Sequence, residues 1–297
     1  MNKLILTLTA IVLSLSMKAQ SITHGPVTGA VTNSSAKVIY FADQSTQAQI
    51  RYATQSNLSN YDSITAQSDA SQGNLIKFKL EDLESNTSYF HQLYLNGSPA
   101  SDVGTFKTRP CNGEASNYVF HFGSCQNENR NADAVFQEML NHPADFFLQI
   151  GDWGYADDTD NLPSNNDFFP AVYSRLIDAY KNKYDYQNMK EYLKTTWVDY
   201  VWDDHDYVDN NTSRNSSSYT DFGIPPVLTE IPFPPGTRRN AISGYYDLFP
   251  AFEPIDSSEG IYHKFRYGNI EVYMLDTRAA RSPTTESIVE INGDYVF

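Results

Sequence analysis

The chain contains few cysteines. Its 297 residues include only two, Cys111 and Cys125, so it can form at most one intramolecular disulfide. In an exported protein this disulfide is one ordinary use of the two residues. A second use of Cys125, as a metal ligand, follows from the motifs described below.

Basic residues are also scarce. The 21 Lys and Arg residues are outnumbered by 36 Asp and Glu residues, and the formal net charge is −15. Because this charge repels a phosphate backbone, polymeric nucleic acid is not an expected partner. A small anionic substrate would need metal cations or local arginines to reverse the field.

Long apolar runs are absent after the N-terminus, so no later segment is expected to cross a bilayer. The N-terminus has Lys3, an apolar run over Leu4–Leu15, and a cleavage zone near Ala19 or Gln20. This pattern predicts a secretory signal peptide over residues 1–20. No cysteine is placed to accept lipid and no twin arginine is present. We therefore expect Sec-type export to a secreted or periplasmic location.

The apolar and aromatic contents, 40% and 14%, are high enough to bury sizeable cores, and the length suggests about two domains. In residues 21–110, short strands are separated by turns of Asn, Ser, Gly and Asp. The clearest strand is Ile76–Leu80, where apolar and charged residues alternate. Regular spacing without a helical period predicts an antiparallel β-sandwich of the fibronectin III type. Further predicted strands are Lys37–Phe41, Gln49–Tyr52, Tyr89–Leu95 and Thr105–Pro110.

Residues 111–297 change character. Predicted strands alternate with predicted helices there, which indicates an α/β domain. The strands are expected at 118–122, 146–150, 197–202 and 270–275, and the helices at 132–140 and within 168–196.

Each of these four strands is followed by chemically useful residues. They end in Gly123-Ser124-Cys125, in Gly151-Asp152, in the acidic run Asp203–Asp206 and in Asp276-Thr277-Arg278. Loops at the carboxyl ends of strands form the ligand crevice of open α/β sheets, so we expect one shared rim. Acids packed this closely repel one another unless cations bind. The pattern therefore predicts a metal site that can activate water.

Each piece also has a plainer interpretation. Gly151-Asp152 could form only a turn with an N-capping carboxylate. The acidic run could be a solvated loop, although Trp197 and Trp202 before it indicate a buried approach. For Asp276-Thr277-Arg278 we expect a mainly structural role.

Four strings of this second part occur together in one known family. They are Phe122–Gln126 (FGSCQ), Gly151–Tyr155 (GDWGY), Trp202–Asp206 (WDDHD) with Asn210 downstream, and Leu275–Arg278 (LDTR). In order and approximate spacing they resemble the PhoD-like (alkaline phosphatase D) metallophosphatases. The first part is similar to that family's N-terminal β-sandwich in Gly25–Val31, Leu83 with Asn86–Tyr89, and Gly104–Thr108.

The resemblance implies a metal centre and its ligands. Asp152 would bridge a centre of two or more metals, and Cys125 and Tyr155 would bind Fe3+ through thiolate and phenolate. Asn210 would bind a second cation, which the family implies is Ca2+. This assignment argues against a Cys111–Cys125 disulfide.

Two further residues receive catalytic roles. His205 would assist at the leaving oxygen or, alternatively, only orient a ligand. Arg238, preferred over Arg239, would bind the phosphate through its guanidinium fork. The alternative for both arginines is a solvated loop, since Pro234-Pro235-Gly236 precedes them.

The expected function is hydrolysis of a small phosphomonoester or phosphodiester outside the cytoplasm. The alternative is a non-catalytic cation-binding or surface interaction module. The family pattern continues to a late Gly-Asp-x-His segment, whereas Gly293-Asp294-Tyr295 lacks the histidine. We therefore expect a C-terminally truncated sequence with an incomplete α/β domain.

Overall fold

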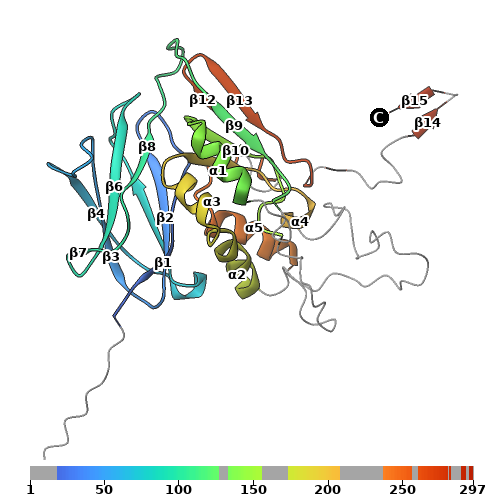
Figure 1. Cartoon of the computed structure of the whole chain (residues 1–297). Coiled ribbons are helices and arrows are strands. Elements are labelled where there is room, and N and C mark those ends of the chain that lie inside the picture. Colours follow the sequence, from blue (N-terminus) through green and yellow to red (C-terminus); the bar gives the residue numbers. More distant parts are fainter. Residues whose placement is uncertain are drawn as a thin grey trace, which may run out of the picture.

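A computed structural model describes residues 19–126, 133–155, 173–207, 237–255, 260–279, 281, 289–291 and 294–296 (Figure 1). The predicted signal peptide lies almost entirely outside these residues, and so does Asn210. None of the helices within the described ranges combines the length and the apolar character that a membrane span requires.

The first part of the chain is built from strands. They are β1 (Ile22–Gly29), β2 (Ala36–Ala42), β3 (Gln47–Ala53), β4 (Asp62–Gln67), β5 (Leu75–Leu80), β6 (Ser88–Leu95), β7 (Ser98–Pro99) and β8 (Gly104–Lys107). Strands β5, β2 and β1 pair antiparallel, and so do β4, β3 and β6, with β7 and β8 both added to β6. Tyr40 of β2 contacts His91 of β6, its hydroxyl 3.2 Å from Nδ1, so the two sheets face each other across a buried core.

Three parallel strands form the centre of the second part. They are β9 (Phe120–Gly123), β10 (Phe146–Gln149) and β11 (Trp197–Tyr200), and β10 pairs with both neighbours. Every residue of β10 and β11 is buried, as expected for parallel strands that are covered on both faces.

Alternate residues of β10 point to different layers. Phe147 contacts Phe136 of α1 (Asp133–Asn141) and Tyr192 of α3 (Gln187–Leu193). Phe146 points the other way, toward Phe265 of β12 (His263–Tyr267). Helices thus cover one face of the sheet, and the hairpin of β12 and β13 (Ile270–Met274) covers the other.

The remaining elements complete these layers. Helices α2 (Tyr173–Lys183) and α5 (Thr237–Leu248) contact each other beside α1 and α3, and α4 (Asp204–Tyr207) is a single short turn after β11 (Figure 1). Two short strands, β14 (Val289–Ile291) and β15 (Asp294–Val296), pair with each other.

One sheet runs through both parts of the chain. Strand β1 pairs in parallel with β11 at Gly29 and Val198, which gives the strand order β5-β2-β1-β11-β10-β9. Gly29 is required at this junction, because a Cβ there would lie 2.5 Å from the carbonyl oxygen of Pro250. The division at residue 110 into a separate β-sandwich and α/β domain therefore stays a prediction.

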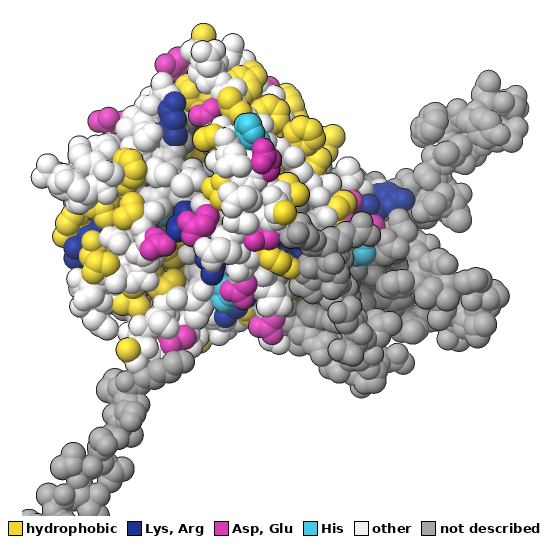
Figure 2. Space-filling model, viewed as in Figure 1, with side chains coloured by type: hydrophobic (Ala, Val, Ile, Leu, Met, Phe, Trp, Pro, Cys, Tyr) yellow, Lys and Arg dark blue, Asp and Glu magenta, His cyan; other side chains and the backbone are white. Residues whose placement is uncertain are grey.

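Around β9, the last strand of this sheet in the described structure, several exposed side chains are apolar. Figure 2 shows hydrophobic side chains gathered toward the upper right of the molecule, where Figure 1 draws β9, β12 and β13. Phe122 of edge strand β9 is 69% exposed, and Tyr273 and Leu275 are exposed to a similar degree.

The strands and helices that the sequence predicted are present, with bounds that differ by a few residues. Strands β1, β4, β7, β12, β14 and β15 and helices α4 and α5 were not predicted. The prediction that 270–275 forms a fourth strand of the α/β sheet is wrong, because β13 pairs with β12 in a separate hairpin. Besides its apolar contacts, that hairpin has a polar partner on the sheet, Asp199 of β11.

Asp199 and His263 form a buried ion pair. Nε2 of His263 lies 3.0 Å from both carboxylate oxygens of Asp199, and Nδ1 lies 2.8 Å from the carbonyl oxygen of Ile261. With an acceptor at each ring nitrogen, the imidazole is held as the doubly protonated cation. Burial lowers the pKa of His263, but the charge and hydrogen bond of Asp199 outweigh burial, and the pKa lies above its ordinary value.

This pair predicts a pH dependence of stability. Because the folded state holds the proton of His263 more tightly than the unfolded state, its contribution is complete below the unfolded pKa of about 6.5 and is lost as the pH rises through the folded pKa. Urea denaturation across this range, compared with His263→Gln, isolates the effect. If the free energy of unfolding changes with pH in the same way in both proteins, the predicted contribution of His263 is contradicted.

Candidate metal centre

The loop after β10 holds an unusual backbone conformation. Gly151, Asp152 and Tyr155 all have positive φ, at 118°, 56° and 43°. A Cβ on Gly151 would lie 2.5 Å from Cβ of Asp203, so only glycine lets the two strand-end loops approach this closely. The left-handed turn at Asp152 then directs its carboxylate toward the neighbouring loop.

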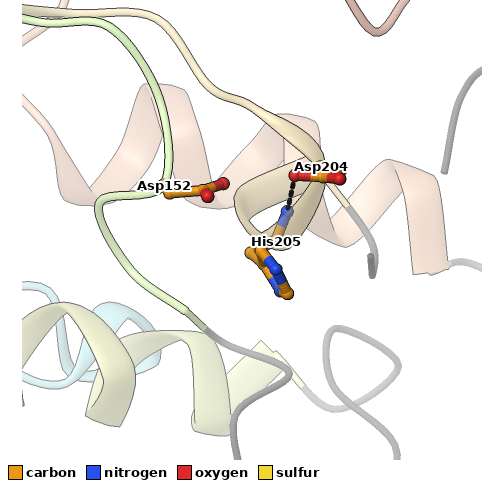
Figure 3. Close-up of side chains that lie close together, drawn as sticks. All are labelled: Asp152, Asp204 and His205. Atoms are coloured by element: carbon orange, nitrogen blue, oxygen red, sulfur yellow. Dashed lines mark hydrogen bonds between the residues drawn. The ribbon is translucent and has the colours of Figure 1, made fainter. Parts of the chain in front are cut away.

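Asp152 meets two residues that follow β11. Asp152, Asp204 and His205 each offer one ligand atom, and these atoms all lie within 4.8 Å of one another. Figure 3 shows the Asp152 carboxylate pointing from its loop toward the helical turn that carries Asp204 and His205. The sequence placed all three on one rim, but it did not single out Asp204 as a ligand.

The carboxylate of Asp152 is only partly satisfied. Its Oδ2 accepts a hydrogen bond from the Tyr155 hydroxyl at 3.1 Å, whereas Oδ1 is buried and meets no hydrogen-bond donor among the described residues. Burial and then the charge of Asp206 raise the pKa of Asp152 to about 7, against an opposing effect of His205. A buried, unpaired carboxylate oxygen beside other acids is the arrangement that a bound cation relieves.

Cys125 lies beside this carboxylate. Its N–H donates to the carbonyl oxygen of Gly151 at 3.1 Å, and the N–H of Gln126 donates to that of Asp152 at 3.0 Å. A hydrogen bond from Ser124 lowers the pKa of the Cys125 thiol, but burial and the charge of Asp152 outweigh it and raise the pKa overall. Cys111 and Cys125 are both exposed, free thiols in the structure, so the alternative of a disulfide between them is wrong.

Tyr155 connects the loop to His205. The two rings stack with centroids 4.7 Å apart and an angle of 27° between their planes. Burial, followed by the charge of Asp152, raises the pKa of the Tyr155 phenol well above its ordinary value. The ammonium group of Lys183, which is 1% exposed, lies 5.3 Å from the centre of the Tyr155 ring.

An arginine that was expected to be structural reaches the cluster. The Arg278 guanidinium forms a short ion pair with Asp203 through Nε, and its Nη2 lies 3.5 Å from Oδ2 of Asp204. Asp276 itself accepts hydrogen bonds from Nε1 of Trp202 and from three backbone N–H groups, those of Ile261, Arg278 and Ala279. Asp276 therefore fastens the end of β13 to the end of β11.

The side chains of two predicted site residues lie outside the described structure. Asn210 lies outside the described residues. Arg238 is the second residue of α5, and only its backbone is described. The structure thus brings together Cys125, Asp152, Tyr155 and His205 of the six residues that the sequence proposed.

The donor set fits a metal ion. Two carboxylates and an imidazole are ligands that divalent first-row cations accept, and a thiol and a phenol lie beside them. The unpaired Oδ1 of Asp152 marks where a further positive charge is needed.

The family model of the PhoD-like phosphatases matches residues 120–294, which is more than half of the chain. The chain therefore belongs to the PhoD-like phosphatase family. A comparison with curated proteins finds no significant match.

A solved structure shows a related fold. The chain is similar to a structure of PhoD, with a TM-score of 0.71 and 19% sequence identity, over 89% of this chain and 53% of that chain. It thus spans about half the length of the structure that it matches. An FN3 domain of human collagen XX matches 30% of this chain and 92% of its own length, with 19% identity and a TM-score of 0.25.

The raised pKa of Asp152 predicts how metal affinity depends on pH. Because a metal and a proton compete for this carboxylate, we expect the affinity for Mn2+ to rise with pH through about 7 and then to level off. Isothermal titration calorimetry of the metal-depleted chain measures this. An affinity that does not change across this range would contradict the assignment of Asp152 as a ligand.

Proposed function

We propose that this chain is an extracytoplasmic, metal-dependent phosphoester hydrolase that acts on a small phosphoester. The observation that carries the proposal is the buried, unpaired Oδ1 of Asp152 beside Asp204 and His205. Membership of the PhoD-like phosphatases supports hydrolysis of a phosphoester. The predicted signal peptide supports an extracytoplasmic location.

The geometry supports a cation site, and the family resemblance implies which metals would occupy it. Asp152, Asp204 and His205 would hold a cation, and Cys125 and Tyr155 are the proposed ligands of Fe3+. Asn210 is the proposed ligand of Ca2+. When bound, such cations offset the charge of the phosphoryl oxygens and lower the pKa of water that attacks phosphorus.

His205 has two ring nitrogens, so one would ligate the cation while a proton on the other is the proposed acid at the leaving oxygen. Its ring belongs to the ligand cluster, and stacking on Tyr155 fixes the plane of the imidazole. A proton held on a ring nitrogen at this position can pass to an ester oxygen as the bond to phosphorus breaks. The alternative is that His205 serves only as a ligand or orients one. Kinetics of a His205 variant on substrates with activated leaving groups separate the two roles.

Arginine and acidic residues shape the rest of the site. Arg238, at the start of α5, is the proposed phosphate-binding residue, because a guanidinium fork matches two phosphoryl oxygens. Arg278 is engaged by Asp203 and Asp204, so its charge is already used to hold those carboxylates in place. The net charge of −15 favours small substrates over polymeric nucleic acid.

Removal of the Asp152 carboxylate tests the function. We expect Asp152→Asn to lower metal-dependent hydrolysis of a nitrophenyl phosphoester by at least about 100-fold, because a neutral amide binds the cations less tightly. Asp178→Asn, at an exposed position of α2, is the matched control and should keep full activity.

Two results would overturn this proposal in different ways. Hydrolysis that persists in pure Asp152→Asn would remove the site assignment. Tight metal binding by the unaltered chain without any hydrolysis would instead favour a non-catalytic cation-binding module.

Absorption spectroscopy tests the iron ligands. If Tyr155 and Cys125 bind Fe3+, the iron-loaded protein should show visible charge-transfer absorption. Tyr155→Phe should lose the tyrosinate contribution while His205 retains an aromatic ring to stack on. An active, colourless preparation free of iron would contradict the iron assignment and leave metal catalysis by other cations in place.

A further inference from the structure

Asp206 is a buried carboxylate to which the proposed mechanism gives no task. It lies in α4, directly after the cluster residues Asp204 and His205, and is 8% exposed. Its side chain is not among the atoms that form the ligand cluster. What it binds is the backbone of the opposite loop.

Both oxygens of Asp206 accept hydrogen bonds from the loop that carries Asp152. Oδ1 accepts the N–H of Gly154 at 2.6 Å, and Oδ2 accepts the N–H of Trp153 at 3.0 Å. Oδ2 also accepts the N–H of Asp203 at 3.3 Å. One carboxylate thus joins the ends of β10 and β11, the two strands that supply the ligands.

The loop needs such a restraint. Trp153 and Gly154 lie between Asp152 and Tyr155, both of which hold left-handed backbone conformations that are unfavourable for a non-glycine residue. Strained conformations of this kind persist only where surrounding contacts enforce them. The charge-assisted hydrogen bonds to Asp206 are among the stronger contacts available for this purpose.

The other side of the loop is anchored by packing. The Trp153 ring is fully buried and contacts Tyr184, Tyr200 and Phe249. With the ring held by the core and the peptide N–H held by Asp206, the backbone between Asp152 and Tyr155 has little freedom. The direction of the Asp152 carboxylate toward Asp204 and His205 follows from this restraint.

We propose that Asp206 is a positioning residue, which sets the distance between Asp152 and the Asp204–His205 pair so that the three can bind one cation. This inference rests on the proposed function, because it assumes that the cluster is a metal site. It assigns to the last acid of the WDDHD string a role distinct from that of its neighbours: Asp206 binds the protein backbone and holds the ligands without contacting the metal.

Asp206→Asn tests this role with almost no change in volume. An amide has only one acceptor oxygen, and its NH2 group would face a backbone N–H, so one of the two loop contacts must break. Partners that orient metal ligands typically change metal affinity or activity by about 10- to 100-fold when they are substituted. We expect a loss of that size in Mn2+ affinity, and a matching fall in kcat with little change in KM.

Asp133→Asn is the matched control. Oδ1 of Asp133 also accepts two backbone N–H groups, those of Asn188 and Met189 at 2.9 and 3.2 Å, but at the start of α3 and outside the ligand cluster. A general loss of stability would affect both variants, whereas a loss of Mn2+ affinity should be confined to Asp206→Asn. Circular dichroism and thermal unfolding establish that each protein is folded.

The experiment measures Mn2+ binding to the full, metal-depleted chain, either by calorimetry or from the paramagnetic resonance signal of free Mn2+. If the unaltered chain binds neither Mn2+ nor the proposed Fe3+ and Ca2+, the proposed function fails. If it binds Mn2+ and folded Asp206→Asn binds equally well, only the positioning role fails.

If Asp206→Asn does not fold, Asp206→Glu replaces it, since it keeps the charge and both acceptors but displaces them by one methylene. An affinity equal to that of the unaltered chain would then overturn the role.

Discussion

The parallel, in-register pairing of β9, β10 and β11 determines the rest of the site. Gly123, Gln149 and Tyr200 lie side by side at the ends of these strands. Whatever follows each strand must therefore emerge at the same edge of the sheet, a few ångströms from its neighbours. Backbone pairing thus places Cys125, Asp152 and the run from Asp203 to Asp206 at one edge of the sheet.

Such crowding of acids is tolerated because each carboxylate is satisfied differently. Asp206 and Asp276 accept backbone N–H groups, and Asp203 and Asp204 share the guanidinium of Arg278. Among the acids of these loops, only Asp152 keeps a buried oxygen without a protein donor in the described structure. The structure thus uses its own donors for four of these carboxylates, and the unmet electrostatic requirement is confined to one atom.

Sequence reasoning predicted the strand ends well, because a buried strand followed by Gly-Asp or by several acids is a local signal. It also identified Cys125, Asp152, Tyr155 and His205 as neighbours, chiefly through resemblance to a family. The ion pairs of Arg278 and the backbone contacts of Asp206 depend on side-chain directions across two loops, and no spacing in the sequence encodes them. The pairing of Gly29 with Val198 was missed for a similar reason, since the two residues are far apart in the chain. Asn210 and the side chain of Arg238 lie outside the described residues, so their assignments remain predictions.

The shared sheet has a consequence for modularity. Because β1 lies against β11, the N-terminal strands occupy what would otherwise be an open edge of the parallel sheet. Helix α2 and the residue that follows it reinforce this connection, since Lys181 and Tyr184 contact Phe41 of β2. The N-terminal strands are therefore joined to the parallel sheet by backbone pairing. They act as a lateral support whose removal would leave β11, and the acidic loop that follows it, without a neighbour on one side.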